Sequence, residues 1–315
     1  MGKSVMLQGT SPMKKSLLFI AFFPVLVLAG QTLAAEPLLD ADWVGANLQR
    51  PGVLFLDVRG KREFGNAHIP GAVHTDYGGK KGWRADKGGV KGMLPGIDYL
   101  QALIGGLGVD NKTHVVVVAG GHGAGEMAKA TRLYWTFKVL GHDQVSILDG
   151  GMAGYFANRA NPLAKGESKP RPKAFTARMN AKLLATAEDV KRALNGGAAL
   201  IDNRSNDQFL GINKSGSVKR PGTIPGAMNV PGVWLTRNGG GAFRDASTIG
   251  KLYETAGAPT EGPAINFCNT GHWASLGWFV SYEILGNKRT RLYDGSLAEW
   301  TTDPANPVER RVKLP

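Results

Sequence analysis

The only cysteine in this chain of 315 residues, Cys268, stands at a position that suits a reactive thiol. It follows an apolar run at 264–267 and opens a loop at 269–273, after which helical spacing begins. Such a loop brings together unpaired backbone amides and the positive end of a helix dipole, and both favour thiolate over thiol. A buried, inert cysteine is the plain alternative, but polar residues and a glycine follow Cys268. We therefore predict a nucleophilic cysteine.

The elements around this loop must place Cys268 at the end of a strand. Residues 115–118 are four consecutive valines, as a strand buried on both faces requires. Apolar residues at helical spacing cover 126–140 and 274–285, and a glycine follows each stretch. The order strand, glycine-containing loop, helix predicts an α/β fold with parallel sheets. Ligands of such sheets gather at the carboxyl ends of the strands, where Cys268 lies.

The sequence also repeats itself once. The matched segments lie 145 to 155 residues apart, which indicates duplicated domains because solenoid units are far shorter. Between the copies, residues 161–179 contain three prolines among lysines and predict an extended linker. We therefore predict one domain at 36–160 and a second at 180–315. The matched segments are 53–59 with 199–204, 68–72 with 223–227, 115–119 with 264–268, and 147–155 with 292–300.

The N-terminus has the layout of a secretion signal. Two lysines precede the apolar run at 17–29, and small residues then reach Ala35. An apolar run of this length is too short to span a bilayer comfortably, so we predict a signal peptide over 1–35, with a retained membrane anchor as the alternative. The expected location is a bacterial periplasm, with no stable membrane insertion after cleavage.

Composition narrows the classes of partner. The formal net charge is +13, but lysines and arginines are scattered, so we expect anionic substrates and no nucleic acid. A single cysteine excludes an intramolecular disulfide and a cysteine-rich metal site. No cluster of histidines and acids has the spacing of metal ligands, and we predict no metal and no cofactor.

Three other catalytic interpretations can be compared with the residues. A cysteine-dependent phosphatase needs an arginine six residues after the cysteine, and Ala274 stands there. A phosphate-binding loop at 120–125 fails because Glu126 occupies the position of its lysine. A cysteine protease needs a partner histidine, and spacing alone leaves His68, His74 and His122 open.

The order of motifs resembles the rhodanese family of sulfurtransferases. In each copy an Asp-x-Arg triplet, an Ile-Pro-Gly-Ala turn, a strand that ends in a loop, and an Asp-Gly motif before an aromatic residue follow one another. Their duplication over residues 40–305 is similar to the tandem thiosulfate and mercaptopyruvate sulfurtransferases. The resemblance implies two rhodanese-like domains, each a parallel sheet flanked by helices. It also implies an inactive N-terminal copy, because Ala119 stands where Cys268 stands.

By this resemblance, Cys268 is the nucleophile that takes a sulfane sulfur from a small donor and holds it as a persulfide. A thiol, cyanide or a protein would then accept the sulfur. The residues expected to bind the donor and the persulfide are Asn269, Thr270, Gly271, His272, Trp273 and Arg204. Thr270 would donate a hydroxyl hydrogen bond, and Gly271 would let the backbone curl. A protonated His272 would attract anions, with a solvent-facing loop histidine as the alternative. Trp273 is expected as a wall of the site, and the Asp-x-Arg pairs as braces of the loops after the strands.

Two departures from the family concern the donor. The loop at 269–273 contains neither lysine nor arginine, and Gln208 stands where relatives often carry an arginine. We therefore expect thiosulfate to be accepted weakly, and better at lower pH where His272 would be charged. The alternative hypothesis is a non-catalytic persulfide carrier or a module that docks a partner.

Overall fold

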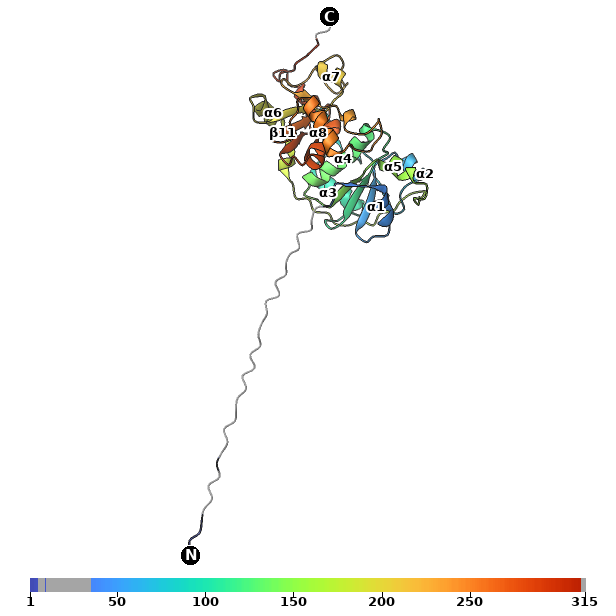
Figure 1. The fold of residues 1–315 in the computed structure, drawn as a ribbon, viewed down its shortest axis with the longest axis vertical. Coiled ribbons are helices and arrows are strands. Elements are labelled where there is room, and N and C mark those ends of the chain that lie inside the picture. The colour runs from blue at the N-terminus through green and yellow to red at the C-terminus, as the bar shows by residue number, and fades with distance from the viewer. Residues whose placement is uncertain (5–8, 10–34, 313–315) are drawn as a thin grey trace. The chain divides into compact units, whose positions relative to one another are not determined.

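The computed structural model describes residues 1–4, 9 and 35–312 (Figure 1). The predicted signal peptide at 1–35 therefore lies almost entirely outside the described residues. Residues 35–312 form one compact unit. Within the described part of the chain, no helix has both the length and the apolar character that a membrane crossing needs.

The N-terminal copy is built on a five-stranded parallel sheet with the order β1-β7-β6-β2-β3. Its strands are β1 (Leu38–Leu39), β2 (Val53–Asp57), β3 (Val73–His74), β6 (His114–Val118) and β7 (Val145–Leu148). Its helices are α1 (Ala41–Ala46), α2 (Lys61–Asn66), α3 (Ile97–Gly106), α4 (Ala124–Val139) and α5 (Gly151–Ala157). A separate antiparallel pair, β4 (Ala85–Lys87) and β5 (Val90–Met93), forms a hairpin outside this sheet.

The C-terminal copy repeats this arrangement, with a parallel sheet of order β10-β9-β11-β12-β8. Its strands are β8 (Leu184–Ala185), β9 (Ala199–Asp202), β10 (Met228–Asn229), β11 (Ala264–Phe267) and β12 (Thr290–Tyr293). Its α-helices are α6 (Ala187–Leu194), α7 (Asn206–Leu210), α8 (Ala246–Thr255), α9 (His272–Phe279) and α10 (Ser296–Trp300). Short helical turns are η1 (Ala181–Leu183), η2 (Gly232–Trp234) and the π-helical η3 (Val280–Ile284). The predicted fold class, two α/β domains with parallel sheets, is confirmed.

One core joins the two copies, and each copy has a second core on its outer face. Along β6, Val115 and Val117 belong to the shared core, whereas Val116 and Val118 face the outer one. All four side chains are fully buried, which explains why the strand reads as an unbroken apolar run. The helices α4 and α9, each of which follows a central strand, pack against each other in the shared core. The two loops that precede these helices are therefore brought close to the interface between the copies.

Residues 161–179 contain no helix or strand and run along the N-terminal copy. Ala164 exchanges two backbone hydrogen bonds of 2.9 Å with His68. Further along, the Gly166 amide donates to the Gly65 carbonyl and the Arg178 amide donates to the Leu140 carbonyl. The segment thus gains backbone partners from the domain that precedes it.

Candidate active site

Cys268 is the residue directly after β11, and its side chain is fully buried. Its carbonyl accepts a hydrogen bond of 3.0 Å from the Leu297 amide, and its own amide donates to Ser296 Oγ over 3.1 Å. Ser296 Oγ also lies 3.9 Å from Cys268 Sγ. Two consecutive residues at the start of α10 therefore fix both the backbone and the sulfur of Cys268.

Ser296 is a site residue that our sequence reasoning missed. It has a φ of +48°, an unusual conformation for a residue with a side chain, while Gly151 occupies the matching place in the N-terminal copy with a φ of +57°. The sequence signal was a serine in the Asp-Gly-Ser triplet at 294–296, where the other copy has Asp-Gly-Gly. The hydroxyl accepts from the amides of Cys268 and Gly271, at 3.1 and 3.2 Å, and so ties the two ends of the loop together.

The loop at 269–273 retains unpaired amide donors. Gly271, the N-cap of α9, has a φ of +74°, and a Cβ there would lie 2.5 Å from an Arg132 nitrogen, so the turn requires glycine. Within the described part of the chain, four amides of this loop donate to no protein acceptor: those of Asn269, Thr270, His272 and Trp273. Unpaired amides at a helix N-terminus are suited to an anion.

Positive charge reaches the loop from the other copy of the repeat. Arg84, from the N-terminal copy, donates through Nη2 to the carbonyl and to Oγ1 of Thr270, over 2.7 and 2.8 Å. Arg132 of α4 is fully buried and donates to the Gly271 carbonyl and to Asp294 Oδ1, over 3.3 and 2.5 Å. The loop has no lysine or arginine of its own, but two arginines of the other copy donate to it, and sequence reasoning missed both. A single sequence held no signal for these contacts, because 186 positions separate Arg84 from Thr270.

His272 does not act as the charged group that we expected. Its Nδ1 lies 2.7 Å from Tyr77 Oη. Burial, followed by the charge of Arg84, lowers the pKa of His272 to about 3, and burial raises the pKa of Tyr77 to about 12. Near neutral pH the phenol is therefore the donor and the neutral imidazole the acceptor. The surroundings thus favour a neutral His272 over the protonated one that we predicted, because desolvation and two arginines oppose the cation.

A cavity of about 200 Å³ lies beside the loop, in the C-terminal copy. Asn269 and Trp273 line it from the loop, and Arg204 and Gln208 line it from the segment that follows β9. The Asn269 side-chain amide donates to Gln208 Oε1 over 2.8 Å. Of the predicted site residues, the structure thus brings Arg204, Asn269 and Trp273 to one cavity.

Arg204 stabilises the loop after β9 and has one nitrogen without a hydrogen-bond partner. Its Nε and Nη2 hold the carboxylate of Asp202 at 2.6–3.1 Å, and Nη2 also donates to the Gly222 carbonyl over 2.8 Å. Its Nη1 is buried and has no hydrogen-bond partner. The matching pair in the other copy, Asp57 and Arg59, makes the same carboxylate contacts. Both pairs therefore brace the loop after a strand, and Arg204 alone lines the cavity beside Cys268.

The ring of Trp273 lies between the two copies. A Cβ on Gly232 would approach the ring within 2.4 Å, and one on Gly125 of α4 would approach it within 3.4 Å. The indole therefore packs against glycines on both sides. This position suits a wall of the cavity that also connects the domains.

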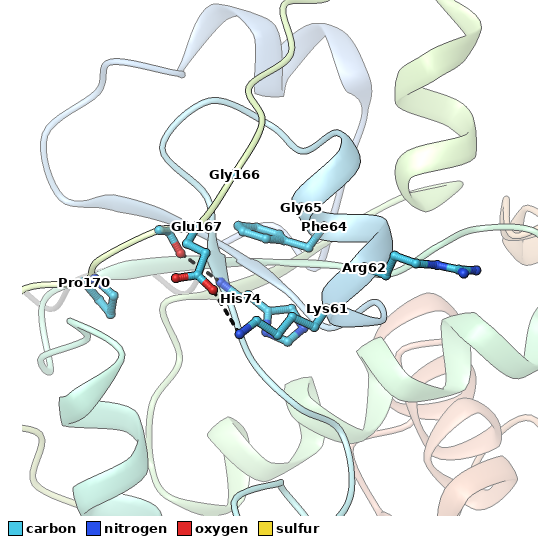
Figure 2. Close-up of a pocket in the computed structure, with 9 residues that line it drawn as sticks. Lys61, Arg62, Phe64, Gly65, His74, Gly166, Glu167 and Pro170 are labelled. Atoms are coloured by element: carbon cyan, nitrogen blue, oxygen red, sulfur yellow. Dashed lines mark hydrogen bonds and ion pairs between the residues drawn. The ribbon is translucent and has the colours of Figure 1, made fainter.

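A larger cavity, of about 660 Å³, lies in the N-terminal copy between α2 and residues 166–170 (Figure 2). An ion pair of 3.0 Å joins Lys61 and Glu167 beside it, and the rings of Phe64 and His74 line it. It contains no thiol and lies in the copy that has no cysteine. We therefore place the chemistry at Cys268 despite the smaller volume there.

The three histidines left open for a protease have partners elsewhere or lie in the other copy. His68 Nδ1 lies 2.8 Å from the Phe64 carbonyl, and His74 Nε2 lies 2.9 Å from the Arg59 carbonyl. His122 is exposed in the loop after β6. The side chain recorded within hydrogen-bond reach of Cys268 Sγ is that of Ser296. In the part of the chain that the structure describes, no group of three or more histidines, cysteines and acids could hold a metal ion.

Comparison with known proteins gives one consistent match. The rhodanese-like domain matches residues 40–158 and again residues 186–303. A protein of Mycolicibacterium smegmatis named "Putative thiosulfate sulfurtransferase" is 32% identical over 87% of this chain and 98% of its own length. Human 3-mercaptopyruvate sulfurtransferase is 31% identical over 86% of each chain. The crystal structure of SseA from Escherichia coli, described as a 3-mercaptopyruvate sulfotransferase, has a TM-score of 0.73 and 27% identity, and the match covers 83% of this chain and 99% of that one.

Proposed function

The chain belongs to the rhodanese family and is a sulfurtransferase, and on that premise we propose that Cys268 carries the transferred sulfur as a persulfide. In the first half-reaction the Cys268 thiolate attacks the outer sulfur of a small anionic donor such as thiosulfate. The new Sγ–S bond forms as the old S–S bond breaks, and sulfite leaves with the electron pair. In the second half-reaction a thiolate or cyanide attacks the terminal sulfur, and Cys268 leaves as thiolate.

The observation that carries this proposal is the position of Cys268 before a loop of unpaired amides. The persulfide is an anion, and the amides of residues 269, 270, 272 and 273 have no protein acceptor among the described residues. Hydrogen-bond donors that are already in place stabilise a charge that forms during the reaction, because they need not reorganise when it forms. Arg84 adds a full positive charge next to Thr270 of the same loop.

The cavity of about 200 Å³ is the entry that we propose for the donor. Cys268 itself is fully buried, so a donor must pass the residues next to it. Asn269, the residue next to Cys268, lines this cavity with Trp273, and so does Arg204, whose buried Nη1 has no hydrogen-bond partner. A sulfonate-like oxygen would satisfy this nitrogen. The site therefore favours small anionic donors, with thiosulfate as the first to test.

Steady-state kinetics with thiosulfate and cyanide separate an enzyme from a persulfide carrier. An enzyme produces many equivalents of thiocyanate and sulfite per chain, and the double-reciprocal lines for the two substrates are parallel, as covalent two-step transfer requires. A carrier loads once and stops at one equivalent of sulfite. One equivalent of sulfite would show that the protein is a persulfide carrier and not an enzyme.

We also propose that the protein is exported to a bacterial periplasm through the signal at 1–35. The proposal rests on the sequence of that segment. Expression of the full chain in a Gram-negative host, followed by fractionation and intact mass, tests it. The expected product is a periplasmic chain that begins at residue 35 or 36. An uncleaved chain that stays with the membrane would favour the retained anchor.

A further inference from the structure

Arg84 is held against the active loop by contacts on three sides. Its Nη2 donates to both oxygens of Thr270, and its Nε donates to the Gly92 carbonyl of the β4–β5 hairpin over 3.2 Å. The guanidinium carbon lies 5.4 Å from the centre of the Tyr77 ring, a cation–π contact. The preceding residue, Trp83, is fully buried and donates through its indole to Thr75. Residue 84 is thus fixed in the N-terminal copy, while its charge faces the C-terminal one.

The hairpin leaves space for this guanidinium. Gly92 has a φ of +77°, and a Cβ there would lie 1.9 Å from Arg84 Nη2. Any larger residue at position 92 would therefore crowd the Arg84 guanidinium and strain the backbone. The copy without a cysteine thus carries a turn shaped around a contact with the copy that has one.

The charge of Arg84 is not neutralised by a neighbouring acid. Arg132 also touches the loop, but its charge is paired with Asp294 over 2.5 Å. Among the ion pairs of the described residues, none includes Arg84. A net positive charge therefore remains at the loop, in a sequence that has no lysine or arginine at 269–273.

The contact also decides what the Thr270 hydroxyl can do. A hydroxyl has one hydrogen and two lone pairs. Because Thr270 Oγ1 accepts from Arg84, its own hydrogen points away from Arg84 and is free to donate elsewhere. We infer that Arg84 is a positioning residue for sulfur transfer, which fixes the Thr270 hydroxyl as a donor to the sulfur held by Cys268 and supplies the positive charge that the loop lacks. The inference rests on the proposed function and adds a role for the N-terminal copy.

A double-mutant cycle on the whole chain tests the inference. The variants are Arg84→Met, which removes the charge, Thr270→Val, which removes the hydroxyl, and the two combined. The readout is the rate at which the chain gains one sulfur from thiosulfate in a single turnover, followed by intact mass, with thermal unfolding beside it. We expect each single variant to load about 10- to 100-fold more slowly, the range for a charge-assisted hydrogen bond. The double variant should load no more than about threefold more slowly than the worse single variant, because both changes remove one interaction.

Two further variants separate positioning from folding. Arg62→Met removes an exposed arginine from the same copy, on a side chain that points away from the other residues of its cavity (Figure 2), and should load at the wild-type rate. Arg84→Lys keeps the positive charge but lacks the planar guanidinium, and it should load sulfur faster than Arg84→Met but more slowly than wild type. The inference is overturned, and the proposed function stands, if Arg84→Met loads sulfur as fast as Arg62→Met. The same conclusion follows if the losses of the two single variants multiply in the double variant. Wild type that gains no sulfur at all would instead remove the proposed function and this inference with it.

Discussion

The loops after β6 and β11 share a backbone hydrogen bond at equivalent positions, but different side chains surround their amides. In the N-terminal copy the Met152 amide donates to the Ala119 carbonyl over 2.8 Å, and in the C-terminal copy the Leu297 amide donates to the Cys268 carbonyl over 3.0 Å. Ala119 and Cys268 therefore occupy equivalent places. The first loop, however, encloses a carboxylate of its own: Glu126 reaches back from α4 and accepts from the His122 amide over 2.9 Å. The second contains the neutral Ser296 and free amides. The N-terminal loop is thus closed by a carboxylate of its own copy, whereas the free amides of the C-terminal loop remain available for the persulfide that we propose.

The interface adds to this difference. An aspartate of each copy accepts a hydrogen bond from a backbone amide of the other copy. Asp149, directly after β7, accepts from the Phe243 amide over 2.8 Å. Asp294, directly after β12, accepts from the Leu94 amide over 2.6 Å. The loop of the N-terminal copy is also covered, because a Cβ on Gly241 would lie 2.6 Å from the Gly121 backbone. In return the N-terminal copy directs Arg84 and Arg132 at the active loop. The cysteine-less copy is therefore part of the site.

The largest effect is expected from moving the cysteine between the copies. Cys268→Ser should reduce turnover to the uncatalysed rate, because no other thiol exists. Adding Ala119→Cys to that variant should restore nothing, since Glu126 occupies the anion position and Gly241 covers the loop. Thiocyanate formation from thiosulfate and cyanide measures both. Appreciable turnover by the double variant would show that the two loops are interchangeable, and the comparison would fail.

A smaller effect is expected from making the active loop resemble its counterpart at one residue. Ser296→Gly relieves a positive φ but leaves the amides of Cys268 and Gly271 without an acceptor. We expect kcat/KM for thiosulfate to fall about tenfold, as for the loss of about 1.4 kcal/mol of stabilisation, while the unfolding temperature changes little because the two effects oppose each other. Ser281→Gly, at a buried serine remote from the loop, serves as the matched control. Unchanged kinetics in Ser296→Gly would remove Ser296 from the site.

The fold could be predicted from the sequence further than the site could. The four valines of β6 and the glycines after the helical stretches are local signals, and they indicated the sheets and helices. The helical spacing predicts a helix from residue 274, but α9 begins two residues earlier, at His272. Arg84 and Arg132 could not be found, since packing between domains has no local pattern. The neutral state of His272 depends on its burial beside Arg84, which the spacing of residues does not reveal.

A third prediction concerns pH, where His272 should contribute nothing to the kinetic profile. With its pKa at about 3, the imidazole stays neutral between pH 5.5 and 8.5. His272→Gln should therefore have the same shape of kcat/KM against pH for thiosulfate as wild type. A wild-type step near pH 6.5 that disappears in His272→Gln would contradict this assignment.

The same depressed pKa predicts the sign of an effect on stability. The unfolded chain binds a proton at His272 below its ordinary pKa of 6.5, whereas the folded chain does so only near 3. Wild type should therefore lose stability relative to His272→Gln as the pH falls from about 6.5 towards 3. Denaturant unfolding at pH 7 and pH 5 measures the difference, and the opposite sign would indicate a charged histidine in the fold.

The smallest effect is expected at Gln208, on the wall of the cavity beside the active loop. Gln208 accepts from Asn269 and lines the cavity, but Arg84 already provides charge to the loop. Gln208→Arg should raise kcat/KM for thiosulfate by less than about tenfold, below the value of a full charge-assisted contact. Gln208→Met controls for the loss of the Asn269 contact. A rise in kcat/KM well above tenfold would mean that the charge of Arg84 does not stabilise bound thiosulfate.

The central claim is that sulfur is held on Cys268 and on no other residue. Intact mass of wild type and Cys268→Ser, each treated with thiosulfate and freed of excess donor, tests it most directly. The account predicts one added sulfur on wild type, located by digestion on the peptide that contains Cys268 and removed by cyanide, and none on Cys268→Ser. Added sulfur on Cys268→Ser, or wild type that turns over without ever gaining sulfur, would contradict it.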